Sequence, residues 1–289
     1  LDLGRITGIK EIGNCNIVAG ASAELIPGNP RITVDSLRAG SITLLGHEYH
    51  GIYGKGGYGK MGPYGTLIID DPSLRMVASG ERMRYTFSVP EIDLKALAID
   101  TREGVSAASF NAGLNFYKDH CELGLYGLKL KDDSGIHDLG NIRADSFRDA
   151  QAQRITINSA FATAKAEFSA GVASFIKDIQ SATTRRELDV LYKDKTEERT
   201  ASDCSISFDV TDAGALLAFL FPDLSLRGNT ALDLDIKDGL LTGRVISENV
   251  AYKNISLRNF AALADNAGDR LNLSLGSSDI HLGGISLNT

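Results

Sequence analysis

The chain has 289 residues, of which 43% are hydrophobic and 23% are charged, and its formal net charge is −7 from 30 Lys and Arg against 37 Asp and Glu. This length is enough for one large domain or two domains of ordinary size. The acidic balance, without a basic stripe, argues against a nucleic-acid partner, because phosphates are bound by clustered Lys and Arg. The longest apolar run, residues 216–221, is far shorter than the roughly 18 residues of a membrane-spanning helix, which excludes such a helix within this chain.

The chain begins with neither a Met nor a charged segment followed by an apolar one, so we expect an internal or processed fragment. Its three cysteines, Cys15, Cys121 and Cys204, lie far apart and show no CxxC spacing. They predict neither a disulfide framework nor a zinc site. We expect them to be buried or half-buried free thiols.

Two segments near residue 50 resemble known site motifs but lack the context of those motifs. Residues 54–60 match GxGxxG and the start of a phosphate-binding loop, yet Met61 stands where that loop needs a hydroxyl, and a strand follows at 66–69. His47 and His50 are one residue short of HExxH spacing, and in a strand they point to opposite faces. We therefore expect a glycine-rich hairpin without a nucleotide, metal or other cofactor. No arrangement of Ser, His, Cys or acidic residues predicts catalysis, so we expect a protein that is not an enzyme.

Alternation of apolar and polar residues with a period of two is the main pattern of the chain and predicts strands with one apolar face. It is clearest at residues 83–89, 205–210, 232–237 and 271–276. Asp, Asn and Gly residues typical of turns separate these runs, as hairpins require. Purely apolar runs, which are typical of a parallel sheet, are scarce. The pattern therefore predicts a mainly β chain arranged as an antiparallel meander.

Two segments interrupt the alternation and are predicted to be helical. Residues 171–195 carry apolar side chains at spacings of three and four, with charged residues on the other faces. Residues 212–221 form a shorter apolar helix, which Thr211 or Asp212 caps and Pro222 ends. A helix this short is not stable alone and must pack against another part of the protein.

Several short phrases occur along the chain in an informative order. They are GIKEIG at 8–13, GTLIIDDPSL at 65–74, a strand pair at 137–162 that leads into a helix, LLAFLFPDL at 216–224 and VAYKNI at 250–255. Their order resembles the central periplasmic region of the TamB-like subunits of the translocation and assembly module, Bacteroidetes type, in the AsmA-like superfamily. The glycine-rich segment around residues 54–65 has no counterpart in that family.

The resemblance implies an elongated antiparallel sheet curled into a U-shaped trough, or β-taco, which lies in the periplasm and is anchored upstream to the inner membrane. Such a trough is thought to carry phospholipid between the inner and outer membranes, which supports outer-membrane assembly and envelope integrity. An outer-membrane partner of the module is expected to bind through regions outside this chain. We accordingly expect a β-trough segment at 1–170, a helical insertion at 171–200 and a second β-trough segment with a short helix at 201–289, as one continuous elongated unit.

The alternating apolar residues are then expected to line the trough and to contact the acyl chains of phospholipid. They are Met83, Tyr85, Phe87, Val89, Ile206, Phe208, Val210, Leu232, Leu234, Ile236, Leu271, Leu273 and Leu275. The alternative is a non-enzymatic β scaffold or adhesin-like module that binds protein or glycan, with its apolar faces closed in a two-sheet sandwich. Tyr49, Tyr53, Tyr58 and Tyr64 are the candidate binding residues of that alternative.

Overall fold

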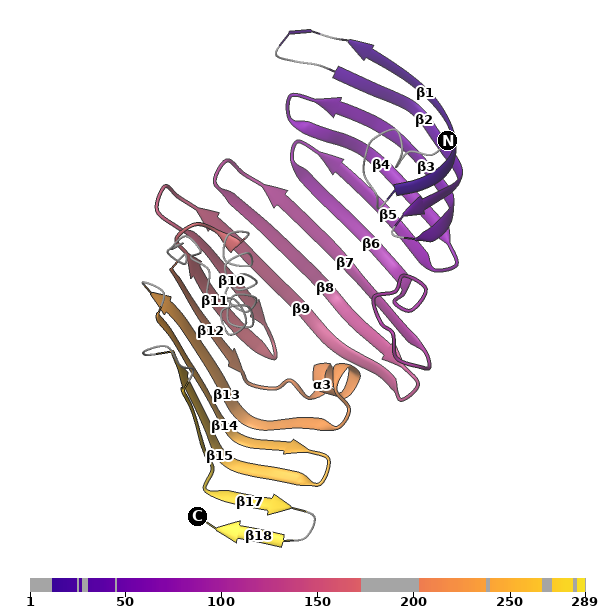
Figure 1. Ribbon diagram of the computed structural model, residues 1–289. Helices are drawn as coiled ribbons and strands as arrows, with labels where there is room; N and C mark the ends of the chain where they lie inside the picture. The colour runs from indigo at the N-terminus through magenta and orange to yellow at the C-terminus, as the bar shows by residue number, and fades with distance from the viewer. Residues whose placement is uncertain are drawn as a thin grey trace, which may run out of the picture. The chain divides into compact units, whose positions relative to one another are not determined.

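The computed structural model describes residues 12–24, 26–27, 31–44, 46–172, 203–237, 240–266, 272–282 and 285–288 (Figure 1). The chain divides into two compact units, residues 1–143 and residues 144–289. Nearly all described elements are strands in antiparallel ladders, which confirms the predicted mainly β architecture. Of the helix predicted at 171–195, residues 173–195 lie outside the described residues.

Unit 1 is an antiparallel meander in which each strand from β1 to β8 pairs with the next. The strands are β1 (Ile12–Glu24), β2 (Arg31–Leu44), β3 (His47–Gly59), β4 (Gly62–Asp71), β5 (Leu74–Glu81), β6 (Arg84–Asp93), β7 (Ser106–Phe116) and β8 (His120–Asp132). β9 (Gly135–Arg148) follows, and the boundary between the units falls within it.

The turn between β5 and β6 corrects one predicted strand residue. Arg82 and Met83 both have positive φ, 51° and 65°, and form a two-residue connection between Glu81 and Arg84. This is the backbone conformation of a type I′ hairpin turn. The prediction that Met83 opens the strand at 83–89 is therefore wrong, because β6 begins at Arg84.

Unit 2 continues the antiparallel pattern. After the end of β9, its strands are β10 (Gln153–Ser159), β11 (Ala162–Phe168), β12 (Cys204–Val210), β13 (Leu224–Lys237), β14 (Leu240–Tyr252), β15 (Ile255–Asp265), β16 (Asn272–Gly276), β17 (Asp279–Leu282) and β18 (Ile285–Asn288). β16 and β17 pair with opposite ends of β15, and β18 pairs with β17. The strands predicted at 205–210, 232–237 and 271–276 correspond to β12, the second half of β13 and β16.

The predicted short helix is present as α3 (Gly214–Leu220), next to β13 (Figure 1). The predicted cap at Thr211 or Asp212 is wrong, because the N-cap residue is Ala213 and has no side-chain cap hydrogen bond. The Asp212 carboxylate accepts a hydrogen bond from the backbone N–H of Gly214 at 3.1 Å, ahead of the helix. On α3, Phe219 is buried and Leu217 packs on a cluster that includes Val210, which supplies the contact that so short a helix needs. Among the described residues, no helix combines the length and apolar character needed to cross a membrane.

Burial in both units is shallow. Among the described residues, no large side chain is less than 2% exposed. In unit 1, Ala39, Tyr49 and Ile52 form a buried cluster, and in unit 2 Phe168 and Cys204 form another. Half-buried apolar side chains at alternate strand positions surround these clusters, so most of the apolar surface belongs to sheet faces and little of it to a sealed interior.

Candidate functional site

The register of unit 1 aligns apolar side chains across eight consecutive strands. Residues paired across neighbouring antiparallel strands point to the same side of the sheet, so each row of partners lies on one face. One row runs through Ala19, Leu37, Gly54, Leu67, Ala78, Phe87, Ala112 and Leu125. We call the side that carries this row the apolar face of unit 1, and the other side its opposite face.

A groove of about 500 Å³ lies on the apolar face of unit 1. Its sides include Leu37, Leu67, Tyr85 and Phe87, all half-buried, and it spans β2 to β6. This volume is within the range of about 300–1,000 Å³ that small-molecule pockets occupy. Most of the surface that lines the groove is apolar.

Glycines form the floor of this groove. Gly56 and Gly65 are paired across β3 and β4, with φ of +150° and +130°. A Cβ atom on Gly56 would lie 2.0 Å from the carbonyl oxygen of Tyr64, so no side chain fits there. Gly80 lies under the ring of Tyr85, since a Cβ on Gly80 would be 2.3 Å from Tyr85 Cδ1. The predicted glycine-rich hairpin is confirmed. At Gly56 and Gly65 the backbones of β3 and β4 lie close together, and the absence of side chains there leaves the space of the groove.

Unit 2 has an apolar face of its own. One row runs through Ile155, Ala166, Ile206, Leu234, Gly243, Ala264 and Leu273, and the next through Ile157, Ala164, Phe208, Leu232, Val245, Ala262 and Leu275. Phe208 is 38% exposed, and Leu275 near the end of its row is 67% exposed. We call this side the apolar face of unit 2.

The structure places the predicted lining residues as follows. Tyr85 and Phe87 lie on the apolar face of unit 1, Val89 is buried further along β6, and Met83 lies in the turn. The unit 2 candidates that share the apolar face of that unit are Ile206, Phe208, Val210, Leu232, Leu234, Ile236, Leu273 and Leu275. Leu271 lies outside the described residues.

Two further residues that line the groove, Leu37 and Leu67, are not indicated by the sequence pattern. Their strands carry apolar residues on both faces, because Ile68 of β4 is 40% exposed on the opposite face. Alternation is hidden where both faces are apolar. Only the register of β3 against its neighbours reveals which residues share the groove.

The four tyrosines of the alternative binding surface do not gather on one face. Tyr49 is buried with Ile52, and its ring contacts His47 edge to face at 4.8 Å. Tyr53 lies on the opposite face, where the Arg38 guanidinium is 5.4 Å from its ring centre. Tyr58 is paired with Pro63, and both line the groove. Tyr64 follows Pro63 in β4, so its side chain points to the opposite face, as that of Thr66 does. The prediction of a tyrosine cluster is therefore wrong.

The side chains of the two histidines in the HxxH-like segment have separate partners. His50 Nδ1 lies 3.1 Å from the carbonyl oxygen of Gly40, whereas His47 Nε2 lies 3.9 Å from Asp71 Oδ1. Burial alone would raise the pKa of the nearly inaccessible Asp71, but hydrogen bonds from the backbone N–H groups of Ser73 and His50 outweigh it and lower that pKa. Asp71 thus acts as a structural acceptor at the end of β4.

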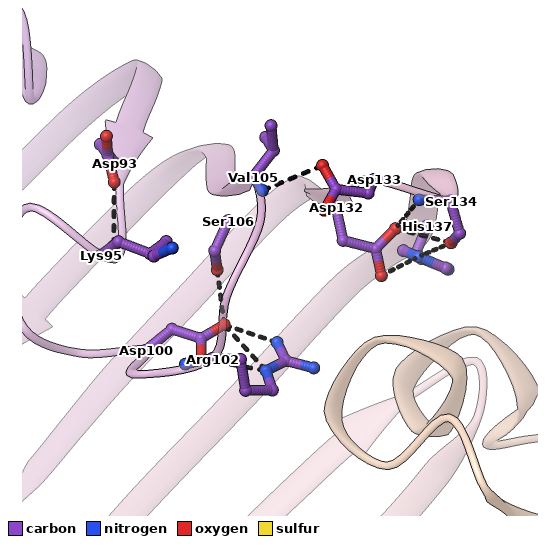
Figure 2. A network of polar contacts seen from close by, with 10 residues as sticks. All are labelled: Asp93, Lys95, Asp100, Arg102, Val105, Ser106, Asp132, Asp133, Ser134 and His137. Atoms are coloured by element: carbon purple, nitrogen blue, oxygen red, sulfur yellow. Dashed lines mark hydrogen bonds and ion pairs between the residues drawn. The ribbon is translucent and has the colours of Figure 1, made fainter.

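A polar network joins the β6–β7 loop to the β8–β9 turn in unit 1 (Figure 2). Its first part is centred on Asp100, whose pKa is held well below the ordinary value by hydrogen bonds from the Arg102 side chain and the Ser106 hydroxyl. Asp133 links the two segments, because its carboxylate accepts a hydrogen bond from the backbone N–H of Val105 at 3.0 Å. The network ties down two connections at one end of the sheet.

The second part of the network holds Asp132, Ser134 and His137, the residue types of a hydrolase triad. Ser134 Oγ donates to Asp132 Oδ1 at 2.6 Å, and His137 Nε2 lies 3.0 Å from Asp132 Oδ2. The Ser134 hydroxyl oxygen also lies 3.3 Å from His137 Nε2, the same ring nitrogen that contacts the carboxylate. In a catalytic triad the histidine instead uses one ring nitrogen for the hydroxyl and the other for the acid, so this arrangement differs from a triad. The Ser134 hydroxyl and then His137 lower the pKa of Asp132 to about 2, so the carboxylate remains ionised as the acceptor that closes the turn.

Searches against protein-family models, curated proteins and solved structures each found no match for this chain.

Proposed function

We propose that this protein is a structural, non-enzymatic conduit that carries phospholipid across the periplasm between the inner and outer membranes. In this proposal the apolar faces of the two units contact the acyl chains, and the sheet curls into a trough. The polar groups of the lipid remain in water.

The observation that carries the proposal is the alignment of apolar side chains in rows across consecutive strands of each unit. In unit 2 the aligned residues Phe208 and Leu232 are 38% and 37% exposed, so they are accessible to a ligand. Contiguous exposed apolar surface is typical of a binding site. Each methylene of an acyl chain that such a face removes from water contributes about 0.8 kcal/mol, so about ten methylenes supply affinity that a few polar contacts would not.

The resemblance to the TamB-like family supports the cellular side of the proposal. It favours a periplasmic location, an inner-membrane anchor upstream and an outer-membrane partner of the assembly module. It also favours a role in envelope integrity that needs no cofactor. These points rest on the order of the short phrases along the chain. A lipid conduit of that family would need aligned apolar rows such as those described above.

The test is to purify the protein without detergent, extract it with organic solvent and analyse the extract by mass spectrometry. A protein of similar size purified from the same cells serves as the control. We expect phospholipid in a fixed ratio to this protein and little with the control. Protein that carries no phospholipid, or no more than the control, contradicts the proposal.

A further inference from the structure

A second concave surface lies on the opposite face of unit 1, across β4, β5 and β6. It is a pocket of about 780 Å³. Its side chains are Tyr64, Thr66, Ser79, Glu81, Arg84 and Thr86, together with Arg82 of the β5–β6 turn. These residues alternate along their strands with the residues of the apolar face, so the pocket and the apolar groove open on opposite sides of the same strands.

The register brings the pocket residues together. Thr66, Ser79 and Thr86 are paired in one row across the three strands, and the hydroxyls of Ser79 and Thr86 are 2.7 Å apart. Glu81 is paired with Arg84 in the row beside them. The pocket therefore combines a line of hydroxyls with an acid and a cation within two strand spacings, about 10 Å.

An aromatic ring and two arginines complete the surface. Tyr64 is 38% exposed. Arg82 pairs with Glu81 at 3.3 Å, whereas the Arg84 side chain has no ion pair or hydrogen bond with any described residue. Arg84 is thus an available cation in the row beside the hydroxyls, in a protein whose net charge is −7.

We propose that this pocket binds an acidic oligosaccharide, that is, a chain of sugar units that includes uronic acids. A sugar ring has an apolar face that stacks on an aromatic ring such as Tyr64, and hydroxyls that bond to Ser79, Thr86 and Glu81. The carboxylate of a uronic acid matches the unpaired cation of Arg84.

Other ligand classes match the pocket less well. A nucleic acid needs more clustered cations than two. A protein partner needs about 800 Å² on each side, whereas these features are confined to three strands. The inference does not rest on the proposed lipid function, because it concerns the opposite face of the sheet.

The test is isothermal titration calorimetry of the protein with a hexamer of galacturonic acid, and with a hexamer of glucose as the neutral comparison. We expect the acidic hexamer to bind and the neutral hexamer to bind at least tenfold more weakly. Tyr64→Ala and Arg84→Ala should each weaken binding of the acidic hexamer at least tenfold. Tyr126→Ala is the matched control, because Tyr126 is a 53% exposed tyrosine on the same face, four strands from Tyr64, and should change nothing.

Several outcomes overturn the inference. They are no binding of the acidic hexamer, equal binding of the neutral hexamer, and equal losses in Tyr64→Ala and Tyr126→Ala. Displacement of the hexamer by inorganic phosphate at a similar concentration also overturns it, because the site then binds any anion. Unchanged thermal unfolding of each variant separates a lost contact from a lost fold, and Tyr64→Phe, which retains the ring, should bind nearly as well as the original protein.

Discussion

The carboxylate of Asp71 accepts a hydrogen bond from the backbone N–H of His50, with 2.8 Å between Asp71 Oδ2 and the His50 nitrogen. Its other oxygen accepts the N–H of Ser73 at 2.8 Å. Beside them, Gly51 has φ +60°, and a Cβ there would lie 2.5 Å from the carbonyl oxygen of Asp70. Asp71 therefore satisfies a backbone group at the point where β3 departs from regular geometry, next to the buried cluster of unit 1.

Replacing Asp71 with Ala should destabilise the protein by about 1–3 kcal/mol at pH 7, because two backbone N–H groups lose their acceptor. The folded-state pKa of Asp71 is lowered, so its contribution is present above the unfolded pKa and is lost as the pH falls through the folded pKa. Urea unfolding at several pH values should show the difference between the two proteins shrinking below about pH 4. The control is Asp70→Ala, whose side chain is 75% exposed and should matter little; equal effects of the two changes would contradict the account.

Gly56→Ala should destabilise the protein by at least about 2 kcal/mol, because its Cβ would overlap the Tyr64 carbonyl oxygen. Gly59→Ala is the matched control in the same strand, since a Cβ there has nothing within 4 Å. Denaturant midpoints of the two variants measure the difference. Similar midpoints would show that β3 and β4 are not as close as described.

The carboxyl group of Asp132 should titrate at about pH 2, because the Ser134 hydroxyl and His137 stabilise its ionised form. Ser134→Ala should raise this midpoint toward the ordinary value of about 3.9, and His137→Gln should raise it less, since the Ser134 hydroxyl has the larger effect. Carbon-13 NMR of the labelled carboxyl group measures both midpoints. A midpoint that does not move in Ser134→Ala would show that the hydroxyl is not the donor.

The mainly β fold was predictable because alternation is a local property of each strand. Alternation also predicted the shared face of Tyr85 and Phe87. The apolar run and Pro222 made α3 predictable, but not its N-cap, because Ala213 stands there in place of Thr211 or Asp212. Met83 was misplaced, because an apolar residue at the right spacing continues the pattern even in a turn. Only the backbone conformation distinguishes a strand from a turn at Met83, because Arg82 and Met83 both have positive φ.

The candidate sites were less predictable, because they depend on which strands are neighbours and on breaks in alternation. Tyr49 and Tyr53 are four residues apart, a spacing that places them on one face of a regular strand. The positive φ of Gly51 breaks the alternation between them, so Tyr49 is buried with Ile52 while Tyr53 lies on the opposite face. A sequence pattern does not contain that break, nor the register that forms the groove and the polar pocket.

Leu234→Asp tests whether the apolar face of unit 2 is open. Leu234 is half-buried in the row between Ile206 and Gly243. An isolated charge in apolar surroundings costs several kcal/mol, so bound phospholipid should fall more than tenfold while the variant remains folded by circular dichroism. Asp235→Lys, a charge reversal on the other side of the same strand, should leave both properties unchanged. An insoluble Leu234→Asp variant would indicate a sealed core. A folded variant with normal lipid content would show that Leu234 does not contact the lipid.

The most direct measurement is photo-crosslinking at Phe208 and at Asp209 in cells, followed by mass spectrometry of the adducts. These residues are neighbours in β12 and point to opposite sides of the sheet. The account predicts phospholipid adducts from a photoreactive residue at position 208 and few from position 209. Equal adducts at both positions, or none at position 208, would contradict a lipid-carrying apolar face.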